Sequence, residues 1–550
     1  MRQKVKPAQK MNSTIKEPQQ AEKVKEDIPS SSGLFEYILT HWRGTFATFF
    51  LLPVSFWFTL WMKIRNKFVF MLRSAPAKHD KRVAEVQRQI KEWNDSGARE
   101  KLTTGRNGWF TMSELVPVYK KTNRKIFLNM YDILEIDEEK KTVRVEPQVN
   151  MGQVTAALNP RGWTLAVVPE LDDLTVGGLI NGFGVETSSH RYGLFQYICE
   201  SFEIVTAEGK LMKCSKDENS DLFSMIPWSY GTLGFLVAVE LKIVPAKKYV
   251  RVEYKPFYSQ DAIVNTFEAE SRKIEENDFV EGLVYSKNAG VIMIGNLVDK
   301  VGKDGKKNAL RRWYKPWFYK HVQEILDNRK IVVEYVPLRH YYHRHTRSLF
   351  WAMAEVIPFG HKGWHRFLFG WMMAPSISLM KYFETETTRR LREKYNVAQD
   401  MLMPISKLKV SLDVFHDRWG LSPIWLCPMA VYEKENKLGF LHPHKREDGS
   451  IDEMFVDIGA YGVGKAAGFD GNTALHECEQ FVIENKGYQA MYAKTLLSKE
   501  DFRKMFDHSY YDELRKKLPN SDKAFTEVYD KLSRKARVSA IDYKKNKIPV

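Results

Sequence analysis

The sequence predicts an α+β fold preceded by one N-terminal transmembrane helix, and three observations lead to this prediction. The chain has 550 residues, which suits two or three domains with separate cores. Residues 125–214 contain several short apolar runs separated by turn residues, the pattern of a strand-rich α+β domain. Residues 44–62 are uncharged, and 19 residues is about the length of a membrane-spanning helix.

Composition narrows the range of partners. The net charge of +16 comes from 84 basic and 68 acidic residues, and the two kinds are interleaved along the chain. We therefore expect no nucleic-acid partner, since a membrane surface or a phosphate-bearing cofactor accounts for the same sign. The four cysteines show no CxxC spacing, which fits a reducing compartment. We expect disorder in about the first 30 residues, which are rich in polar residues and proline.

The uncharged segment reads GTFATFFLLPVSFWFTLWM. We interpret it as a retained membrane anchor, because its apolar run is too long for a cleaved signal peptide and no small-residue cleavage site follows. A buried soluble helix is the alternative. Pro53 is tolerated inside a membrane helix, and Trp57 and Trp61 suit a membrane interface.

Flanking charges predict the orientation of this anchor. More basic residues follow the segment closely than precede it, so the positive-inside rule places the large C-terminal body in the cytosol and the N-terminus across the membrane. The basic residues are Lys63, Arg65, Lys67, Arg73, Lys78, Lys81 and Arg82 after the segment, and Lys23, Lys25 and Arg43 before it.

Two further segments each leave two interpretations open. Residues 367–380, FLFGWMMAPSISLM, are too short and too interrupted to cross a membrane, so they form either a core element or a patch that enters the bilayer surface. Residues 78–92 are basic and amphipathic, and they form either a calmodulin target or, as we favour, a helix with one solvated face.

Helices are expected at two places among the strands. MGQVTAALNPRG, residues 151–162, has helical composition, and a second helix is predicted just before Pro227.

A glycine-rich stretch, LTVGGLINGFGVETSSHRYG, occupies residues 174–193. GFGVET within it lacks the third glycine of a dinucleotide fingerprint and follows no clean apolar strand, which disfavours a Rossmann site. No GxxxxGK[ST] motif is present, which excludes a P-loop. Glycines 177, 178, 182 and 184 would let main-chain N–H groups approach a diphosphate, with hydroxyl groups of Thr175, Thr187, Ser188 and Ser189 nearby. A tightly packed turn without a ligand is the alternative.

At these residues the sequence resembles a known family. PELDDLTVGGLINGFGVETSSHRYG (169–193) and DLFSMIPWSYGTLGFLVAVEL (221–241) resemble the FAD-binding domain of the vanillyl-alcohol-oxidase type, and specifically the delta(24)-sterol reductases, or Diminuto/Dwarf1-like proteins. The resemblance covers nearly the whole chain after the anchor. It continues in YKPWFYKHV (314–322), EYVPLRHYYHRHTRSLFW (334–351), PIWLCP (423–428) and MFVDIGAYG (454–462).

The resemblance implies a domain organisation. Residues 1–69 would form a flexible N-terminus and the anchor helix, and residues 70–246 a two-subdomain PCMH-type FAD-binding domain. Residues 247–550 would form a C-terminal substrate-binding domain with an antiparallel sheet and helices.

The resemblance also implies the cofactor site. TTGRNGW (103–109) would be the first flavin loop and GTLG (231–234) would close the isoalloxazine side. Relatives with covalent FAD use a histidine in the first loop, where this chain has Arg106 and Asn107, so we expect non-covalent FAD. The residues implied to line the flavin diphosphate are Thr175, Val176, Gly177, Gly178, Leu179, Ile180, Asn181, Gly182, Phe183, Gly184, Val185, Glu186 and Thr187.

The implied reaction is reduction of the 24(25) double bond of a sterol side chain, with NADPH as electron donor, in sterol biosynthesis. An isolated alkene needs a proton on carbon 24 and a hydride on carbon 25, so the site needs an acid in a dry pocket. RHYYHRHTR, residues 339–347, offers candidates; if extended, it would send His343 and His345 to one face and Arg344 to the other. We predict His343 as proton donor or relay, with Tyr461 and Tyr492 as alternatives.

The resemblance implies no metal, and a zinc site from the histidines of residues 340–345 is a minor alternative. The implied partners are a sterol substrate and a membrane, and the implied location is the endoplasmic reticulum membrane, single-pass, with the catalytic body in the cytosol. Two other functions stay open. One is an FAD-dependent oxidase of an alcohol or sugar lactone on the same fold, and the other is a non-catalytic membrane-anchored binding or scaffold protein.

Overall fold

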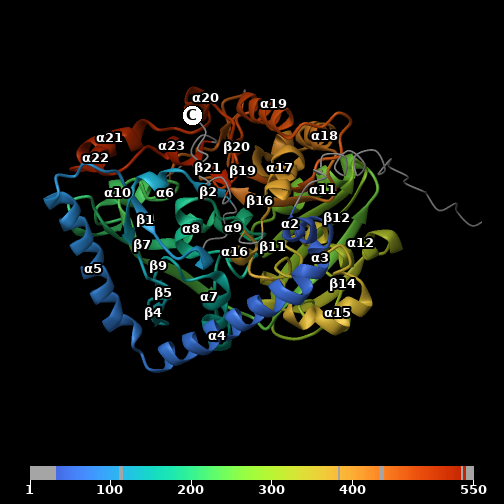
Figure 1. Cartoon of the computed structure of the whole chain (residues 1–550). Helices are drawn as coiled ribbons and strands as arrows, with labels where there is room; N and C mark the ends of the chain where they lie inside the picture. The colour runs from blue at the N-terminus through green and yellow to red at the C-terminus, as the bar shows by residue number, and fades with distance from the viewer. Residues whose placement is uncertain are drawn as a thin grey trace, which may run out of the picture.

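The structure is a computed structural model that describes residues 33–110, 115–381, 384–432, 439–446, 448–533 and 537–539. Its two largest sheets come from consecutive parts of the chain and helices flank both of them (Figure 1). The chain therefore has the mixture of helix and sheet that the sequence predicts. The predicted disorder near the N-terminus, together with Lys23 and Lys25, lies outside the described residues.

The first large sheet is antiparallel and six-stranded, in the order β4-β5-β9-β7-β8 with β6 also paired to β9. Beside it, two short strands, β1 and β3, pair in parallel. The apolar runs predicted as strands are confirmed, since each overlaps one of these strands. The strands are β1 Leu102–Gly105, β3 Arg124–Phe127, β4 Ile133–Asp137, β5 Thr142–Val145, β6 Trp163–Leu165, β7 Cys199–Val205, β8 Leu211–Ser215 and β9 Phe235–Pro245.

Both predicted helices in this region are confirmed. The first is α7, Met151–Leu158, which continues into a 3-10 turn at Asn159–Arg161, and the second is α10, Ser220–Met225. A reciprocal capping box begins α7: the Asn150 side chain accepts from the Gln153 amide at 2.9 Å, and the Gln153 side chain accepts from the Asn150 amide at 3.0 Å.

Helix α5, Ala75–Asp95, includes the basic amphipathic residues 78–92. Val83, Val86, Ile90 and Trp93 are buried in a small core that α5 shares with β3 and β7. The apolar face is thus packed within the protein and the opposite face is exposed, as expected for a helix with one solvated face.

The second large sheet has nine strands in the order β13-β14-β10-β12-β11-β16-β19-β15-β20, antiparallel except for the β13–β14 pair. Its buried residues and those of the first sheet form one continuous core. The strands are β10 Tyr249–Phe257, β11 Phe279–Ser286, β12 Ala289–Val298, β13 Lys306–Lys307, β14 Val332–Pro337, β15 Asn396–Pro404, β16 Ile424–Ala430, β19 Met454–Val463 and β20 Tyr488–Gln489.

Helices of the C-terminal half fall into two groups. The first group packs along the second sheet: α11 Gln260–Ser271, α12 Phe318–Asn328, α17 Glu386–Tyr395, α18 Leu408–Trp419 and α19 Gly471–Glu484. The last helices turn back over the first part of the chain, where α21 lies against α10 (Figure 1). These are α20 Lys499–Met505, α21 Ser509–Lys517, α22 Ser521–Ala524 and α23 Val528–Leu532.

The apolar N-terminal segment is helical from Arg43 to Met71, and among the described residues it is the one helix long and apolar enough to span a membrane. It consists of α3 Arg43–Phe46, a π-helical turn at Ala47–Leu51 and α4 Leu52–Met71. The wide turn comes just before Pro53, whose missing N–H interrupts the regular hydrogen-bond pattern. Only 28% of its most apolar stretch is buried within the protein.

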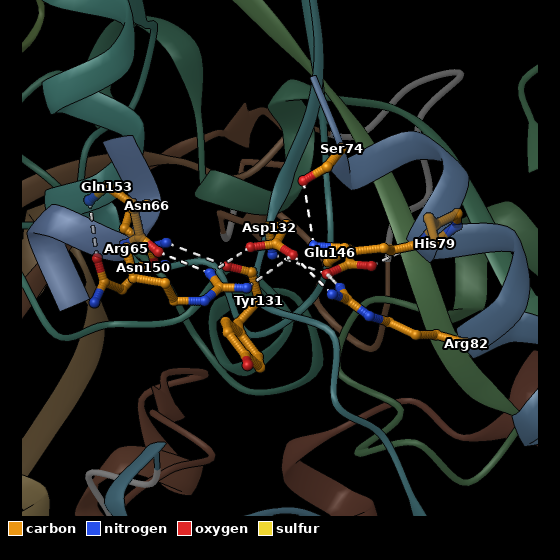
Figure 2. Close-up of polar contacts among 11 residues, drawn as sticks. Arg65, Asn66, Ser74, His79, Arg82, Tyr131, Asp132, Glu146, Asn150 and Gln153 are labelled. Carbon is orange, nitrogen blue, oxygen red and sulfur yellow. Dashed lines mark hydrogen bonds and ion pairs between the residues drawn. The ribbon is translucent and has the colours of Figure 1, made fainter. Parts of the chain in front are cut away.

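The C-terminal half of α4 is fixed to the first part of the chain by buried charges (Figure 2). Arg65 on α4 pairs with Asp132 at 2.6 Å. Arg82 on α5 pairs with both Asp132 at 2.9 Å and Glu146 at 2.7 Å, and His79 contacts Glu146 at 2.9 Å. Because Asp132 and Glu146 are buried, they need these partners, so the network holds both helices in place.

Candidate active site

The glycine-rich stretch folds as α8, Val176–Asn181, followed by a turn and by α9, Ser189–Tyr192. Amides in a first helical turn have no partner within the helix. Here the Val176 amide donates to Val149 O at 2.9 Å and the Gly177 amide to Pro147 O at 2.7 Å. Among the described residues, the Gly178 amide has no such acceptor, so it is the amide that stays available to a ligand.

The glycines of this stretch serve two different purposes. A Cβ at Gly177 would lie 2.8 Å from Pro147 Cβ, and one at Gly184 would lie 2.7 Å from Phe195 Cβ, so both positions need glycine for packing. Gly178 is exposed, and a Cβ there would meet only the Thr175 hydroxyl oxygen, at 2.9 Å. Gly178 therefore presents bare backbone to the outside, while residues 182–187 are buried.

A strained turn lies beside α8. Trp228 and Tyr230 have φ values of +69° and +54°, in a region that residues with side chains seldom adopt. The Trp228 amide donates to Ile180 O at 3.0 Å, and the Gly231 amide donates to the Asn181 side-chain oxygen at 2.8 Å. Backbone held in this way often occurs at functional sites, and this turn leads directly into the predicted GTLG segment.

Four basic side chains, which we call the basic set, gather around this turn and the first predicted flavin loop: Arg106, Lys120, Lys381 and Lys531. Lys381 donates to Gly108 O at 2.8 Å, and Lys531 donates to Tyr230 O at 3.1 Å. Burial lowers the pKa of all four side chains. The positive charge of Arg106 adds to this effect at two of them: the pKa of Lys120 is far below its usual value, and the pKa of Lys381 is lowered to about 8. Arg106 Nε is buried and has no hydrogen-bond partner in the part of the chain that the structure describes. An anion bound here would favour the charged forms of these side chains and would give Arg106 Nε a hydrogen-bond acceptor.

One buried arginine joins the two parts of the chain. Arg344 pairs with Glu186 of the glycine-rich stretch and with Glu281 of β11, each at 2.9 Å, and all three side chains are fully buried. His345 contacts the other oxygen of Glu281 at 2.7 Å. Burial alone would raise the pKa of Glu281, but Arg344 and His345 outweigh it and hold the pKa at about 2. Glu281 is thus ionised at neutral pH.

The RHYYHRHTR segment is not extended, so the alternation of side chains that an extended segment would have does not apply. It begins in a short helix, α13 Leu338–Tyr342, and continues as turns. His343 contacts the Thr155 hydroxyl at 2.8 Å and lies 3.7 Å from Asp172, whereas His345 faces Glu281. Burial lowers the pKa of His343 to about 3, so its ring is neutral at pH 7.

The two alternative proton donors lie in different surroundings. Tyr461, on β19, is largely buried and donates to Asp400 at 2.5 Å. Tyr492 follows β20 and is 44% exposed. His343 therefore contacts the first part of the chain, whereas Tyr461 lies on the second sheet and Tyr492 is partly exposed. Sequence reasoning missed the basic set beyond Arg106 and missed Asp400 itself.

Comparison with known proteins gives the family. Residues 85–215 match the FAD binding domain family. The human delta(24)-sterol reductase is 48% identical over 502 residues, which cover 91% of this chain and 95% of the human protein. The delta(24)-sterol reductase of Arabidopsis thaliana is 38% identical over 90% of this chain and 92% of the plant protein. This chain belongs to the delta(24)-sterol reductase family. The mouse L-gulonolactone oxidase, by contrast, is 30% identical over only 21% of this chain.

The cofactor of this family member is FAD, since an FAD binding domain is present. The residues fit it: the available Gly178 amide, the exposed backbone of α8 and the basic set all suit a diphosphate. For the zinc alternative, the part of the chain that the structure describes contains no group of three or more His, Cys, Asp or Glu side chains that could hold a metal ion.

Arg344→Met is expected to destabilise the fold by about 3–5 kcal/mol, because it leaves two buried carboxylates without their cation. Urea denaturation followed by circular dichroism measures this. The loss should be largest above about pH 4.5, where Glu281 would be ionised even unfolded, and should shrink as the pH falls toward 2, the folded-state pKa. Arg144→Met, which removes a more exposed pair with Glu203, is the control, with an expected loss of about 0–1 kcal/mol. Equal losses in both variants would contradict the role of Arg344.

Proposed function

We propose that this protein reduces the 24(25) double bond of a sterol side chain, with FAD as bound cofactor and NADPH as electron donor. The observation that carries the proposal is the similarity to delta(24)-sterol reductases along nine-tenths of the chain. A sugar-lactone oxidase is less well supported, because that similarity is confined to a fifth of the chain. A scaffold without cofactor would have no need for buried cations around an open loop.

The two large sheets support a division of the chain into two domains. We propose that residues 70–246 form a two-subdomain FAD-binding domain and residues 247–550 a substrate domain. The first sheet ends with β9 at Pro245 and the second begins with β10 at Tyr249, which supports a boundary there. In this proposal the sterol side chain lies between the second sheet and the glycine-rich stretch.

The residues proposed to hold FAD are Thr175–Thr187 together with the basic set. Bound and reduced FAD supplies a hydride. The chain's own residues hold the diphosphate, with the Gly178 amide and Arg106 as donors, and keep water away from the reacting carbons. Arg106 and Asn107 stand where a covalent attachment would need a histidine, so we propose non-covalent FAD. His343 stays a candidate for the proton donor or relay, acting as a neutral ring that contacts Thr155.

We also propose that the protein is bound to the endoplasmic reticulum membrane with its catalytic body in the cytosol. Two groups of exposed apolar side chains support this and form what we call the apolar surface. They are Phe49, Phe50, Trp57 and Trp61 on the N-terminal helix, and Trp364, Phe367, Leu368 and Trp371 on α15 Gly363–Phe369 and the turn after it. Exposed tryptophans are typical of membrane interfaces.

The contacts of the N-terminal helix favour an arrangement in the plane of the membrane over a single-pass one. The helix touches the body near its start, where the Thr48 hydroxyl lies 3.1 Å from His365 Nε2. It touches the body again near its end, where Arg65 pairs with Asp132. A helix that crosses the bilayer cannot rest against a cytosolic body at both ends, since the two contacts lie about 25 Å apart along its axis.

The reductase proposal predicts a specific mass change. Holoenzyme purified in detergent, incubated with NADPH and desmosterol, should yield a sterol heavier by two mass units, because one proton and one hydride add to the double bond. Mass spectrometry of the extracted sterol measures this. Bound flavin with no such product would overturn the assignment for this substrate. Rapid oxygen-dependent turnover of a sugar lactone without NADPH use would favour the oxidase instead.

Gly178→Val is expected to abolish flavin retention, because it inserts a branched side chain where the diphosphate approaches the exposed backbone. The ratio of absorbance at 450 and 280 nm of the purified protein measures retention. Gly363→Val is the matched control, since a Cβ there meets nothing within 4 Å. Normal flavin content in folded Gly178→Val would refute the placement. Acid precipitation should release the flavin of the unaltered protein into the supernatant, as expected for non-covalent binding.

Replacing Trp371, Phe367 and Leu368 together with serine is expected to weaken binding to anionic phospholipid vesicles at least 10-fold, because it removes apolar area from the apolar surface. Vesicle co-sedimentation measures this. A glycan-acceptor tag fused before residue 33 tests the arrangement: the tag should stay unglycosylated if the helix lies in the membrane plane. Glycosylation would instead support the single-pass arrangement.

A further inference from the structure

Two neighbouring strands of the second sheet, β15 and β19, carry polar side chains on an otherwise apolar face. In the register of β15 and β19, Asp400 is opposite Gly459 and Leu402 is opposite Asp457. Residues opposite each other point to the same face, and so do alternate residues along a strand. Asp400, Asp457 and Tyr461 therefore share one face of this sheet.

Asp400 and Tyr461 form a close pair. The Tyr461 hydroxyl donates to Asp400 Oδ1 at 2.5 Å. Gly459 is opposite Asp400 on the neighbouring strand and comes two residues before Tyr461. A Cβ at Gly459 would come within 2.8 Å of both the Asp400 oxygen and the Tyr461 hydroxyl. Aromatic side chains surround the pair, with the ring centroids of Phe350 and Trp351 at 4.7 and 5.6 Å from that of Tyr461. The pair is thus fixed in position in apolar surroundings.

Two further carboxyl groups, those of Asp457 and Glu170, lie near this pair. Asp457 is fully buried, and among the described residues neither of its carboxyl oxygens has a hydrogen-bond partner. Glu170, from the loop before α8, is 8% exposed. An isolated buried carboxylate is very unfavourable, so such groups keep their proton. Burial raises the pKa of Asp400 to about 7, and burial and the neighbouring carboxyls raise the pKa of Asp457 and Glu170 well above the usual value.

The carboxyl groups lie where the second sheet meets the glycine-rich stretch. Glu186 of that stretch lies close to Glu170, because the charge of Glu186 raises the pKa of Glu170. The Val280 amide of β11 donates to Thr187 O at 2.9 Å, and α9 lies against β16, the neighbour of β19. The acid and the proposed FAD-binding residues are therefore on facing sides of one junction.

We propose that Asp400 is the acid that protonates the sterol double bond, with Tyr461 as its positioning residue. The inference rests on the proposed function. In the step, the alkene electron pair takes the proton of the Asp400 carboxyl group and forms the new bond at carbon 24. The cation left at carbon 25 would take up the hydride that bound, reduced FAD supplies, and NADPH would provide the electrons that reduce the flavin again. Asp400 is left as a carboxylate and regains a proton afterwards.

The surroundings of Asp400 suit this task. An acid works best when its pKa is near the working pH, which the pKa of Asp400 matches. The titratable groups that face it are Tyr461 and Asp457 on β19 and Glu170 on the loop, and raised pKa values keep all three protonated, so none of them offers a positive charge that would stabilise the Asp400 carboxylate. Arg344, near Glu170, is the cation on the other side and is already paired with Glu186 and Glu281.

The experiment separates the two half-reactions of the holoenzyme. After anaerobic reduction by NADPH, desmosterol is added and the return of absorbance at 450 nm is followed by stopped flow. Asp400→Asn should bind FAD and be reduced by NADPH at the normal rate, but sterol-dependent reoxidation should fall about 10²–10⁴-fold, the usual effect of a general acid. The matched control is Glu479→Gln, another buried carboxyl whose pKa is raised to about 7, on α19; it should reoxidise normally.

Positioning is tested by the pH dependence of the same rate. The rate should fall as the pH rises through the pKa of Asp400. Tyr461→Phe removes a hydrogen bond to the anion, so this fall should move to higher pH, whereas Asp457→Asn replaces a group that already holds its proton and should leave the fall where it is. An unchanged pH profile in Tyr461→Phe would mean that Tyr461 is merely structural.

Two outcomes overturn the assignment of Asp400, and a third concerns the proposed function alone. Normal reoxidation in folded, flavin-bound Asp400→Asn overturns it, as does a His343→Gln variant that loses reoxidation while Asp400→Asn keeps it. If sterol fails to reoxidise the unaltered holoenzyme, the proposed function is wrong, so the unaltered holoenzyme is measured before any variant.

Discussion

A single buried cation, Arg344, determines how the two halves of this protein meet. It lies between Glu186, which belongs to the glycine-rich stretch, and Glu281, which belongs to the second sheet. In a medium of low dielectric constant, neither carboxylate can be ionised without it, and the two would repel each other in its absence. Because its donors point in fixed directions, the guanidinium also sets the orientation of one sheet relative to the other. Trp425 Nε1 adds a bond to Glu281 at 2.8 Å and extends the network to β16.

The arrangement separates two kinds of charge. Cations gather around the first flavin loop and the strained turn at Trp228 and Tyr230, where an anionic cofactor would neutralise them. Protonated carboxyl groups gather on the facing sheet, where a proton is needed and a negative charge would be unfavourable. Arg344 is paired with Glu186 and Glu281, of which Glu281 is ionised at neutral pH. The reaction that we propose needs both a hydride and a proton, and the residues that we propose to hold FAD and to supply the proton come from different parts of the chain.

Local features of the chain were predictable from the sequence, whereas long-range contacts were not. The strands of the first sheet, α7 with its Asn150 cap and the apolar helix follow from patterns within a few residues. The conformation of residues 339–347 does not, since His343 and Arg344 are fixed by Thr155 and Glu186, more than 150 residues away. Asp400 and Asp457 left one signal: each is the only acid in an apolar strand, QDMLMP or MFVDIGAYG. That signal shows a buried acid but not which others lie beside it.

One stretch of chain, residues 344–381, connects every part of the proposed site. It begins at the Arg344 ion pairs and passes Tyr461, to whose carbonyl oxygen Trp351 donates at 2.5 Å. It then packs on the N-terminal helix, where Trp371 and Phe56 have ring centroids 5.0 Å apart. It ends at the first flavin loop, where Ser378 donates to Trp109 O at 2.7 Å. A sterol is nearly insoluble in water and must arrive from a lipid phase, while an acid and a hydride donor both need water excluded. One continuous segment meets the apolar surface at one point and the proposed acid and cofactor residues at others, so it joins the proposed membrane-facing side of the protein to the proposed site of the reaction.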